Sequence, residues 1–193
     1  MGMRAMSLRP HDGILGDSVL LSSLYEPALT SDPEEFEKSI PGSCLVVAAD
    51  AAREEDPGLG IKTILTDPSS RGRLGEAPGR GLARALVWIQ KRPGSNVFAN
   101  MVTLGRAANN DILINDARAS KVHLLLAPAH GPWEWAVTEM GSSNGTHLNG
   151  APLCVGEKRV LTPGDRLEIA GAIVLEFLDP PALAQLLRAE AIR

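Results

Sequence analysis

Between residues 85 and 178 the apolar positions fall into short runs separated by turn residues. In residues 133–137, large apolar side chains alternate with polar or small ones, which predicts a strand with one buried face. The sequence Pro-Gly-Ser-Asn at 93–96 predicts a hairpin turn between the first two runs. This pattern is typical of an all-β sandwich or barrel. The expected strands are 85–90, 97–104, 112–114, 122–126, 133–137, 160–161, 167–169 and 173–178.

The first 83 residues lack this regular pattern. Asp32-Pro33-Glu34-Glu35 combines an N-cap acceptor, a first-turn proline and acidic residues, so it predicts a short helix at about 33–39. A buried strand is expected at about 43–48, and the Gly/Pro-rich stretch 56–81 is interpreted as a linker or a long irregular loop. We therefore expect a mixed N-terminal extension of unknown role, residues 1–83, before a domain at 84–178.

A short C-terminal helix is expected over residues 179–193. Asp179-Pro180-Pro181 supplies a cap and a helix start, and Leu183, Leu186 and Leu187 lie on one face of the predicted helix. We expect this face to dock on the sandwich rather than on a partner.

Charge narrows the range of partners. The chain of 193 residues has a formal net charge of −4, which argues against a general nucleic-acid binder. Residues 84–121 nevertheless hold six Lys or Arg residues against two Asp residues. A local positive excess of this size favours a small anionic ligand over a duplex.

Other sequence features predict location and exclude classes of site. The N-terminus has no apolar signal-peptide core and no run is long enough to span a bilayer, so we expect a cytoplasmic protein without a membrane partner. Cys44 and Cys154 have no metal-ligand spacing and are expected to be free buried thiols. No motif predicts a cofactor, and the four histidines are not spaced as a metal cluster.

Three polar loops carry the candidate chemistry, and each joins two expected strands. The first begins at Gly105-Arg106, the second contains Ser120-Lys121, and the third is GSSNGTHLNG, residues 141–150. The third loop is rich in hydroxyls, amides and free N–H groups that can donate to an anion, and it ends on the hairpin dipeptide Asn149-Gly150.

The segments GRAANNDILINDARASKVHL and GSSNGTHLNG together resemble the signature of forkhead-associated (FHA) domains. The resemblance covers residues 84–178, about half the chain, and is specific because three separated motifs occur in the right order and spacing. It implies an eleven-stranded β-sandwich that binds phosphothreonine peptides through loops at one end. It also implies a role in protein–protein interaction and signalling, with a phosphothreonine-containing partner such as a Ser/Thr kinase or its substrate.

The resemblance also assigns roles to individual residues. Lys121 stands where the family most often has Arg, and Glu139 where Asp is usual, but neither change removes a principal phosphate ligand. Structural support of the site is expected from Gly105, His123, Gly145, Thr146 and Asn149. The phosphopeptide-binding residues are expected to be Arg106, Ser120, Lys121, Ser143 and Asn144.

Two functions are alternatives to phosphopeptide binding. Gly16-Asp17-Ser18 matches the nucleophile block of one esterase family, but no Asp-x-x-His pair follows to complete a triad, so we expect no enzymatic activity. The second alternative is a structural or assembly module that has the same fold and binds its partner without phosphate.

Overall fold

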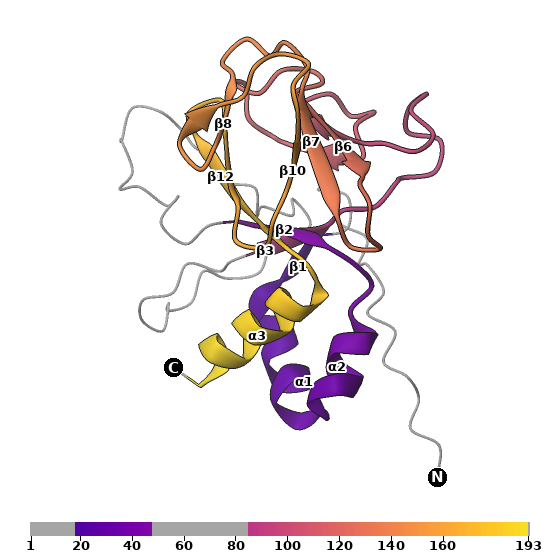
Figure 1. The fold of residues 1–193 in the computed structure, drawn as a ribbon, viewed down its shortest axis with the longest axis vertical. Helices are drawn as coiled ribbons and strands as arrows, with labels where there is room; N and C mark the ends of the chain where they lie inside the picture. Colours follow the sequence, from indigo (N-terminus) through magenta and orange to yellow (C-terminus); the bar gives the residue numbers. More distant parts are fainter. Residues whose placement is uncertain (1–17, 48–84, 193) are drawn as a thin grey trace, which may run out of the picture.

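The computed structural model describes residues 18–47 and 85–192. They form two sheets packed face to face, with helices gathered at one end of the molecule (Figure 1). Neighbouring strands are antiparallel throughout, except for the parallel pair β4 and β5. The five-stranded sheet has the order β10 (Lys158–Val160), β7 (Trp135–Glu139), β6 (Leu124–Pro128), β4 (Val102–Gly105) and β5 (Ile112–Leu113). The seven-stranded sheet has the order β1 (Ser18–Leu20), β3 (Ala85–Trp88), β2 (Cys44–Val47), β12 (Ile173–Leu178), β11 (Arg166–Ile169), β8 (Thr146–Leu148) and β9 (Ala151–Pro152).

The all-β sandwich expected from the sequence is confirmed. The resemblance implies eleven strands, whereas the described residues form twelve, and β1 and β2 come from before residue 84. One apolar cluster fills the space between the sheets because alternate residues of each strand point inward. Its fully buried members include Leu104, Leu124 and Val137 from the five-stranded sheet and Leu167, Ile169 and Phe177 from the seven-stranded sheet.

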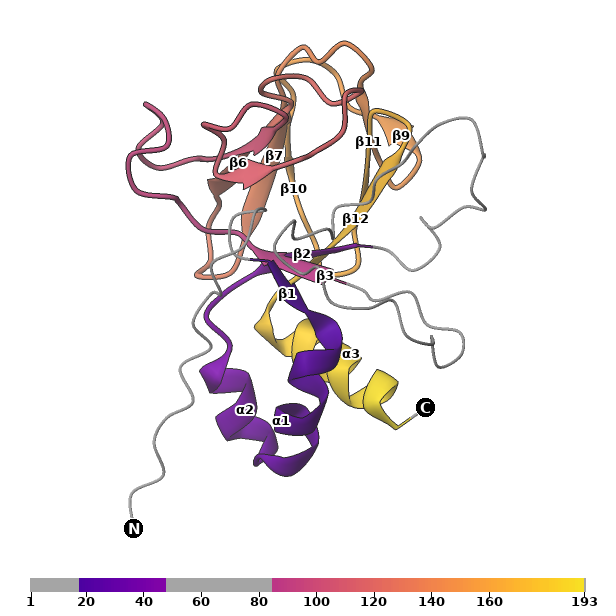
Figure 2. The ribbon, with the colours of Figure 1, turned by 180° about the vertical axis from the view of Figure 1, so that it is seen from behind.

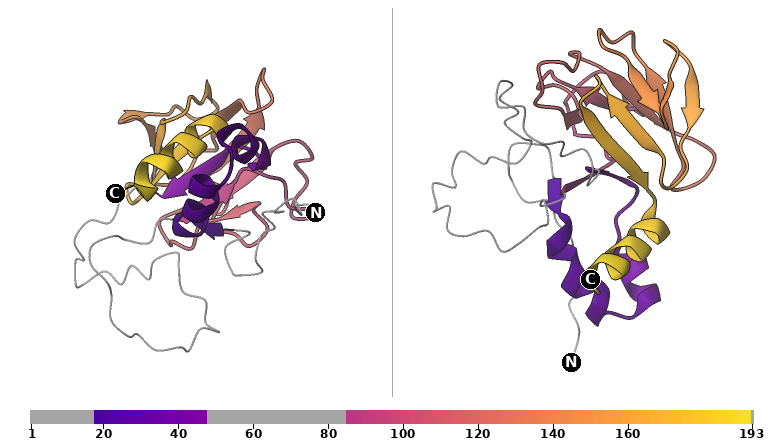
Figure 3. Two further views of the ribbon diagram at one scale, coloured as in Figure 1. Left: turned by 90° about the horizontal axis from the view of Figure 1, so that it is seen from below. Right: turned by 90° about the vertical axis from the view of Figure 1, so that its left-hand side faces the viewer.

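A second apolar cluster covers the outer face of β1, β2 and β3 in the seven-stranded sheet. It joins alternate residues of β2 and β3 to the 3-10 helix η1 (Leu21–Leu24) and to α1 (Tyr25–Thr30), α2 (Pro33–Ser39) and α3 (Pro180–Ala191). Figure 3 shows these helices side by side below the sheet. Because both faces of β2 are covered, its sequence Cys-Leu-Val-Val is continuously apolar rather than alternating.

The helix ends follow the capping signals in the sequence. The Asp32 carboxylate accepts hydrogen bonds from the N–H groups of Glu34 and Glu35, at 3.0 and 3.2 Å, and α2 begins at Pro33. At the start of α3, Asp179 accepts from Ala182 N–H at 2.9 Å. The buried Leu183 and Leu187 of α3 pack in the second cluster, so this helix contacts the N-terminal helices as well as the sandwich.

Three details differ from the sequence expectations. The predicted hairpin around 93–96 was wrong, because β3 pairs with β1 and β2 while β4 lies in the other sheet. The strand expected at 133–137 begins only at Trp135, and Trp133 is 41% exposed. Cys154 is exposed rather than buried, whereas Cys44 is buried as expected. The stretch 56–81 and the Gly16-Asp17 pair lie outside the described residues.

Candidate functional site

Three loops meet at the end of the sandwich opposite the helices (Figure 2). They are the β4–β5 loop (106–111), the β5–β6 loop (114–123) and the β7–β8 loop (140–145). Main-chain hydrogen bonds join the first two: Arg106 N–H donates to Ser120 O at 2.9 Å, and Ala107 N–H donates to Lys121 O at 3.1 Å. The two candidate cations therefore lie on loops that are bonded to each other.

Gly105 allows this close approach of the two loops. An added Cβ would lie 2.6 Å from Lys121 O, 2.9 Å from Ser120 O and 3.0 Å from His123 N, all of which are main-chain atoms. A main-chain atom cannot rotate away as a flexible side chain does, so any larger residue must push the loops apart.

We expect Gly105→Ala to lower the free energy of unfolding by about 1–3 kcal/mol, because the added methyl group overpacks this contact. Chemical denaturation measures the loss. Gly42→Ala is the matched control, since the Cβ added there would meet its nearest neighbour, the Trp133 ring, at an ordinary 3.6 Å. Equal stability of the two variants would contradict the close-approach role of Gly105.

His123 lies beneath the loops and bridges two of them. Its side chain is fully buried, and its Nδ1 accepts a hydrogen bond from Ser120 N–H at 3.0 Å. An accepting Nδ1 places the proton of the neutral ring on Nε2, which then donates to Gly145 O at 3.1 Å. One imidazole thus fixes the main chain of the β5–β6 loop and of the β7–β8 loop.

Glu139 and Thr146 anchor the two ends of the β7–β8 loop. The buried Glu139 carboxylate accepts from Thr146 Oγ1 and from Ser142 N–H, both at 2.6 Å, and lies 4.0 Å from His123 Nε2. Burial acts to raise the pKa of Glu139, but the hydrogen bonds from Thr146 and Ser142 outweigh it and hold the pKa below its ordinary value. The carboxylate therefore remains charged and keeps both bonds at neutral pH.

Arg106 is exposed on the β4–β5 loop. Its Nε donates to Ala119 O at 3.0 Å, and the side chain forms no salt bridge with any carboxylate in residues 18–47 or 85–192. The single main-chain bond orients the group while its terminal nitrogens keep their donors for a ligand. Lys121 is likewise exposed and forms no salt bridge within the described part of the chain.

Ser120 lies between these cations and the β7–β8 loop. Its Oγ accepts a hydrogen bond from Ser143 N–H at 3.0 Å. Because the oxygen acts as the acceptor in this bond, the hydroxyl hydrogen can be donated to a ligand. The structure therefore places Ser120 in direct contact with Ser143.

Asn144 is exposed and its amide Nδ2 donates to Arg118 O at 2.8 Å. Gly145 follows with φ of +69°, a left-handed conformation that glycine adopts without strain. Its carbonyl also accepts from Ala170 N–H at 3.0 Å, which ties the loop to the end of β11. Ser143 and Asn144 are thus held on a well-supported turn beside Arg106 and Ser120.

Asn149 lies apart from this group. It occupies the β8–β9 turn with Gly150, at φ of +52° and +82°, as the Asn-Gly dipeptide predicts. Its side chain donates to Asp165 Oδ1 at 2.7 Å and accepts from Arg166 N–H at 2.8 Å. These bonds join two turns and leave the Asn149 amide engaged with the protein itself.

Sequence reasoning missed two residues that shape the site. The buried Asn110 donates through Nδ2 to Ala107 O at 2.8 Å and to Lys121 O at 2.5 Å, bridging the β4–β5 and β5–β6 loops. The Arg118 guanidinium pairs with the Asp116 carboxylate at 2.6 and 3.0 Å, and this partner lowers the pKa of Asp116. Asn110 belongs to a polar run before the apolar residues 112–114, and nothing local in the sequence distinguishes it from its neighbours.

Three other features bear on function: possible metal ligands, the cysteine thiols and possible membrane-spanning helices. Within residues 18–47 and 85–192, no group of three or more His, Cys, Asp or Glu side chains could hold a metal ion. Burial raises the pKa of the Cys44 thiol, with Asp179 and Glu176 acting in the same direction. None of the helices in the described ranges has the length and apolar character that a bilayer crossing requires.

The three loops lie within a segment that matches a known protein family. A family model described as the FHA domain matches residues 102–170, which include all three loops. The glycogen accumulation regulator GarA of Mycolicibacterium smegmatis is 32% identical over 124 residues, which cover 61% of this chain and 75% of that protein. An oxoglutarate dehydrogenase inhibitor of Corynebacterium glutamicum is 30% identical over 141 residues, which cover 71% of this chain and 88% of that protein.

Two further matches are partial. An ABC transporter ATP-binding/permease protein of Mycobacterium tuberculosis is 35% identical over 115 residues, but these residues cover only 12% of that protein. The solution structure of the FHA domain of an Arabidopsis thaliana hypothetical protein shares 30% identity, with a TM-score of 0.39, over 42% of this chain and 67% of that chain. The two regulators, each matched over more than two thirds of its length, together with the domain match across the three loops, show that this chain belongs to the forkhead-associated (FHA) domain family.

Proposed function

We propose that this protein binds phosphothreonine peptides on the surface formed by the β4–β5, β5–β6 and β7–β8 loops. The observation that carries this proposal is an exposed Arg106 guanidinium without a salt-bridge partner in the described residues, oriented by Ala119 O, one residue before Ser120. FHA domains are phospho-motif readers that use Arg in this way. A phosphothreonine carries a charge of roughly −1.5 to −2 and three strong acceptor oxygens at neutral pH.

Each binding residue has a distinct part in this proposal. Arg106 donates two parallel charge-assisted hydrogen bonds to the phosphate, and the Ser120 hydroxyl donates a third. Lys121 adds a point charge on the neighbouring β5–β6 loop, with less geometric selectivity than an Arg would give. Gly105, His123, Gly145 and Thr146 hold these groups in place, and Asn149 supports the adjoining turn.

The β7–β8 loop orients the peptide. Ser143 and Asn144 are exposed and lie directly beside Ser120. The Asn144 amide is anchored through Nδ2 to Arg118 O, so its oxygen can accept from a peptide N–H while the side chain stays fixed. A main-chain contact of this kind sets the direction of an extended peptide without reading its sequence.

The partner we propose is a protein phosphorylated on threonine, such as a Ser/Thr kinase or its substrate. One relative is named a glycogen accumulation regulator and another an oxoglutarate dehydrogenase inhibitor, which supports a regulatory binding role rather than an enzymatic one. The two unpaired cysteines fit a reducing compartment, and we place the protein in the cytoplasm.

Peptide titration with Arg106→Ala tests the proposal. Fluorescence anisotropy compares a phosphothreonine peptide library with the same peptides lacking phosphate. We expect binding only to the phosphorylated set, and we expect Arg106→Ala to weaken it at least about 100-fold, because two charged hydrogen bonds contribute about 3 kcal/mol or more.

Arg159→Ala is the matched control, since Arg159 is an exposed cation on β10 and its removal changes the net charge equally. We expect it to leave peptide affinity within about twofold. Equal affinity for phosphorylated and unphosphorylated peptides would instead support the phosphate-independent assembly module. A large loss of thermal stability in Arg106→Ala would assign this residue a structural role.

A further inference from the structure

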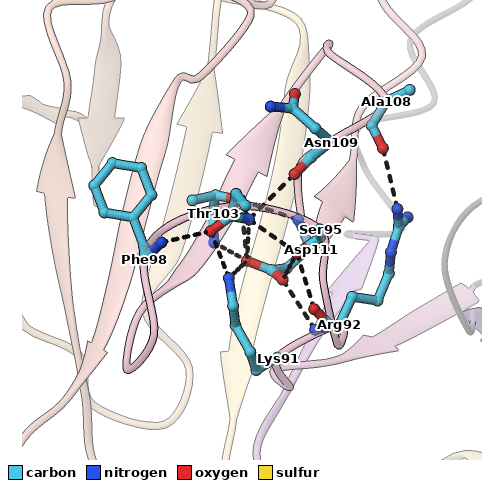
Figure 4. A network of polar contacts seen from close by, with 9 residues as sticks. Lys91, Arg92, Ser95, Phe98, Thr103, Ala108, Asn109 and Asp111 are labelled. Atoms are coloured by element: carbon cyan, nitrogen blue, oxygen red, sulfur yellow. Dashed lines mark hydrogen bonds and ion pairs between the residues drawn. The ribbon is translucent and has the colours of Figure 1, made fainter.

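The connection between β3 and β4, residues 89–101, is held by a buried carboxylate (Figure 4). The Asp111 side chain is fully buried and accepts from Lys91 Nζ at 2.9 Å, Arg92 N–H at 2.9 Å and Ser95 Oγ at 2.6 Å. Asn96 Nδ2 donates to the same carboxylate at 3.0 Å. Hydrogen bonds from four residues to one carboxylate thus fix the first half of a connection that has no regular secondary structure.

The same connection is bonded to the proposed phosphate-binding loop. Arg92 Nη2 donates to Ala108 O at 3.0 Å, and Asn96 Nδ2 donates to Asn109 O at 3.1 Å. Asn96 also fixes the next residues, because its Oδ1 accepts from Phe98 N–H at 3.1 Å. The Asn96 side chain therefore links the residues on either side of Val97 to the loop that carries Arg106.

This anchored segment exposes apolar side chains. Val97 is 92% exposed, the highest value among the large apolar residues that the structure describes as exposed, and Met101 is 39% exposed. In both Figure 1 and Figure 2 the connection projects from the molecule beside β6. An apolar side chain on a fixed main chain loses little conformational entropy when it contacts a partner, which is the condition for a preorganised contact.

We infer that Val97, with Met101, is a second contact for the bound partner and takes an apolar side chain of the same chain that carries the phosphothreonine. This inference rests on the proposed function. The hydrogen bonds to Ala108 and Asn109 make the surface continuous with the phosphate-binding loop, so one extended peptide can reach both. The protein would then select peptides that carry, besides the phosphothreonine, an apolar residue at a fixed number of positions from it.

A positional scan with phosphothreonine peptides tests this inference. Each peptide of about 15 residues carries Leu at one position on either side of the phosphothreonine, in a background of Ser and Ala, and its Ser counterpart is the reference. We expect one position, or two adjacent ones, at which Leu binds about tenfold more tightly than Ser, a ratio that corresponds to 1.4 kcal/mol. In Val97→Ser we expect that ratio to fall to nearly one.

Val160→Ser is the matched control, because Val160 is an exposed valine on β10, at the edge of the five-stranded sheet away from β4. It should keep the tenfold ratio. The inference is overturned if no position prefers Leu, or if the preference survives in Val97→Ser. It also fails if the protein binds no phosphothreonine peptide, but that result removes the proposed function first and is distinguished by the loss of binding to the Ser reference peptides.

Discussion

A chain that begins at residue 84 should not fold. The expected domain boundary at this residue separates β3 from both of its neighbours, because β3 lies between β1 and β2 in the seven-stranded sheet. The lost segment also supplies η1, α1 and α2, which cover the outer face of β2 and β3. Its fully buried apolar side chains, including Leu21, Leu24 and Leu45, contribute on the order of 10 kcal/mol of burial, comparable with the whole stability of a domain.

Thermal unfolding followed by circular dichroism measures this effect. We expect no cooperative transition for the chain that begins at residue 84, and a cooperative one for a chain that begins at residue 18 and keeps every described element. A native-like, cooperative transition in the shorter chain would show that β3 and β12 can pair without β2 between them. The N-terminal segment would then be a separable accessory.

The sequence predicted the parts of the fold that depend on local pattern. Strands β4 to β7, β11 and β12 overlap the expected apolar runs, although β4 begins only at Val102. Helices α2 and α3 begin at their Asp caps, and Asn149-Gly150 forms the expected tight turn. The order of the three loops was also visible, because each follows a strand and carries its own short motif. These features depend on neighbouring residues and can be interpreted without knowledge of tertiary contacts.

Features set by distant contacts were not predictable in this way. The turn signal at 93–96 is real, but strand pairing is decided by burial in two different sheets, so β3 and β4 do not form a hairpin. Trp133 fits the alternating pattern, yet its carbonyl accepts from Ser43 Oγ at 2.8 Å in a connection that precedes β7. The role of Asn110 depends on loops that meet only in the folded protein.

Asp111 is the clearest residue whose importance appears only in the structure. As one acid in a polar run it gives no sign in the sequence of being buried. In the fold it accepts hydrogen bonds from five residues: Lys91, Arg92, Ser95, Asn96 and Thr103. If such a buried carboxylate loses its charge, the charged partner that faces it, here the Lys91 ammonium, is left without compensation.

We expect Asp111→Asn to lower the free energy of unfolding by about 3–5 kcal/mol at neutral pH, because it leaves the Lys91 ammonium facing an amide and turns one accepting oxygen into a donor. Chemical denaturation measures the loss. Asp116→Asn is the matched control: Asp116 is paired with the exposed Arg118, so its loss should cost less than about 1 kcal/mol. Equal losses in the two variants would contradict the central role of Asp111.

The stability lost in Asp111→Asn should also depend on pH. Burial acts to raise the pKa of Asp111, but the hydrogen bonds from Ser95, Thr103, Lys91 and Asn96 outweigh it and hold the pKa far below its ordinary value. A carboxyl group with a depressed pKa in the folded state stabilises the protein fully above its unfolded pKa of about 4, and this contribution is lost as the pH falls below that value. The stability difference between the natural protein and Asp111→Asn should therefore be constant from about pH 5 to 7 and shrink steadily below pH 4. Urea denaturation at several pH values measures it, and a difference that stays constant down to pH 2 would mean that the cost of Asp111→Asn comes from packing rather than from the charge.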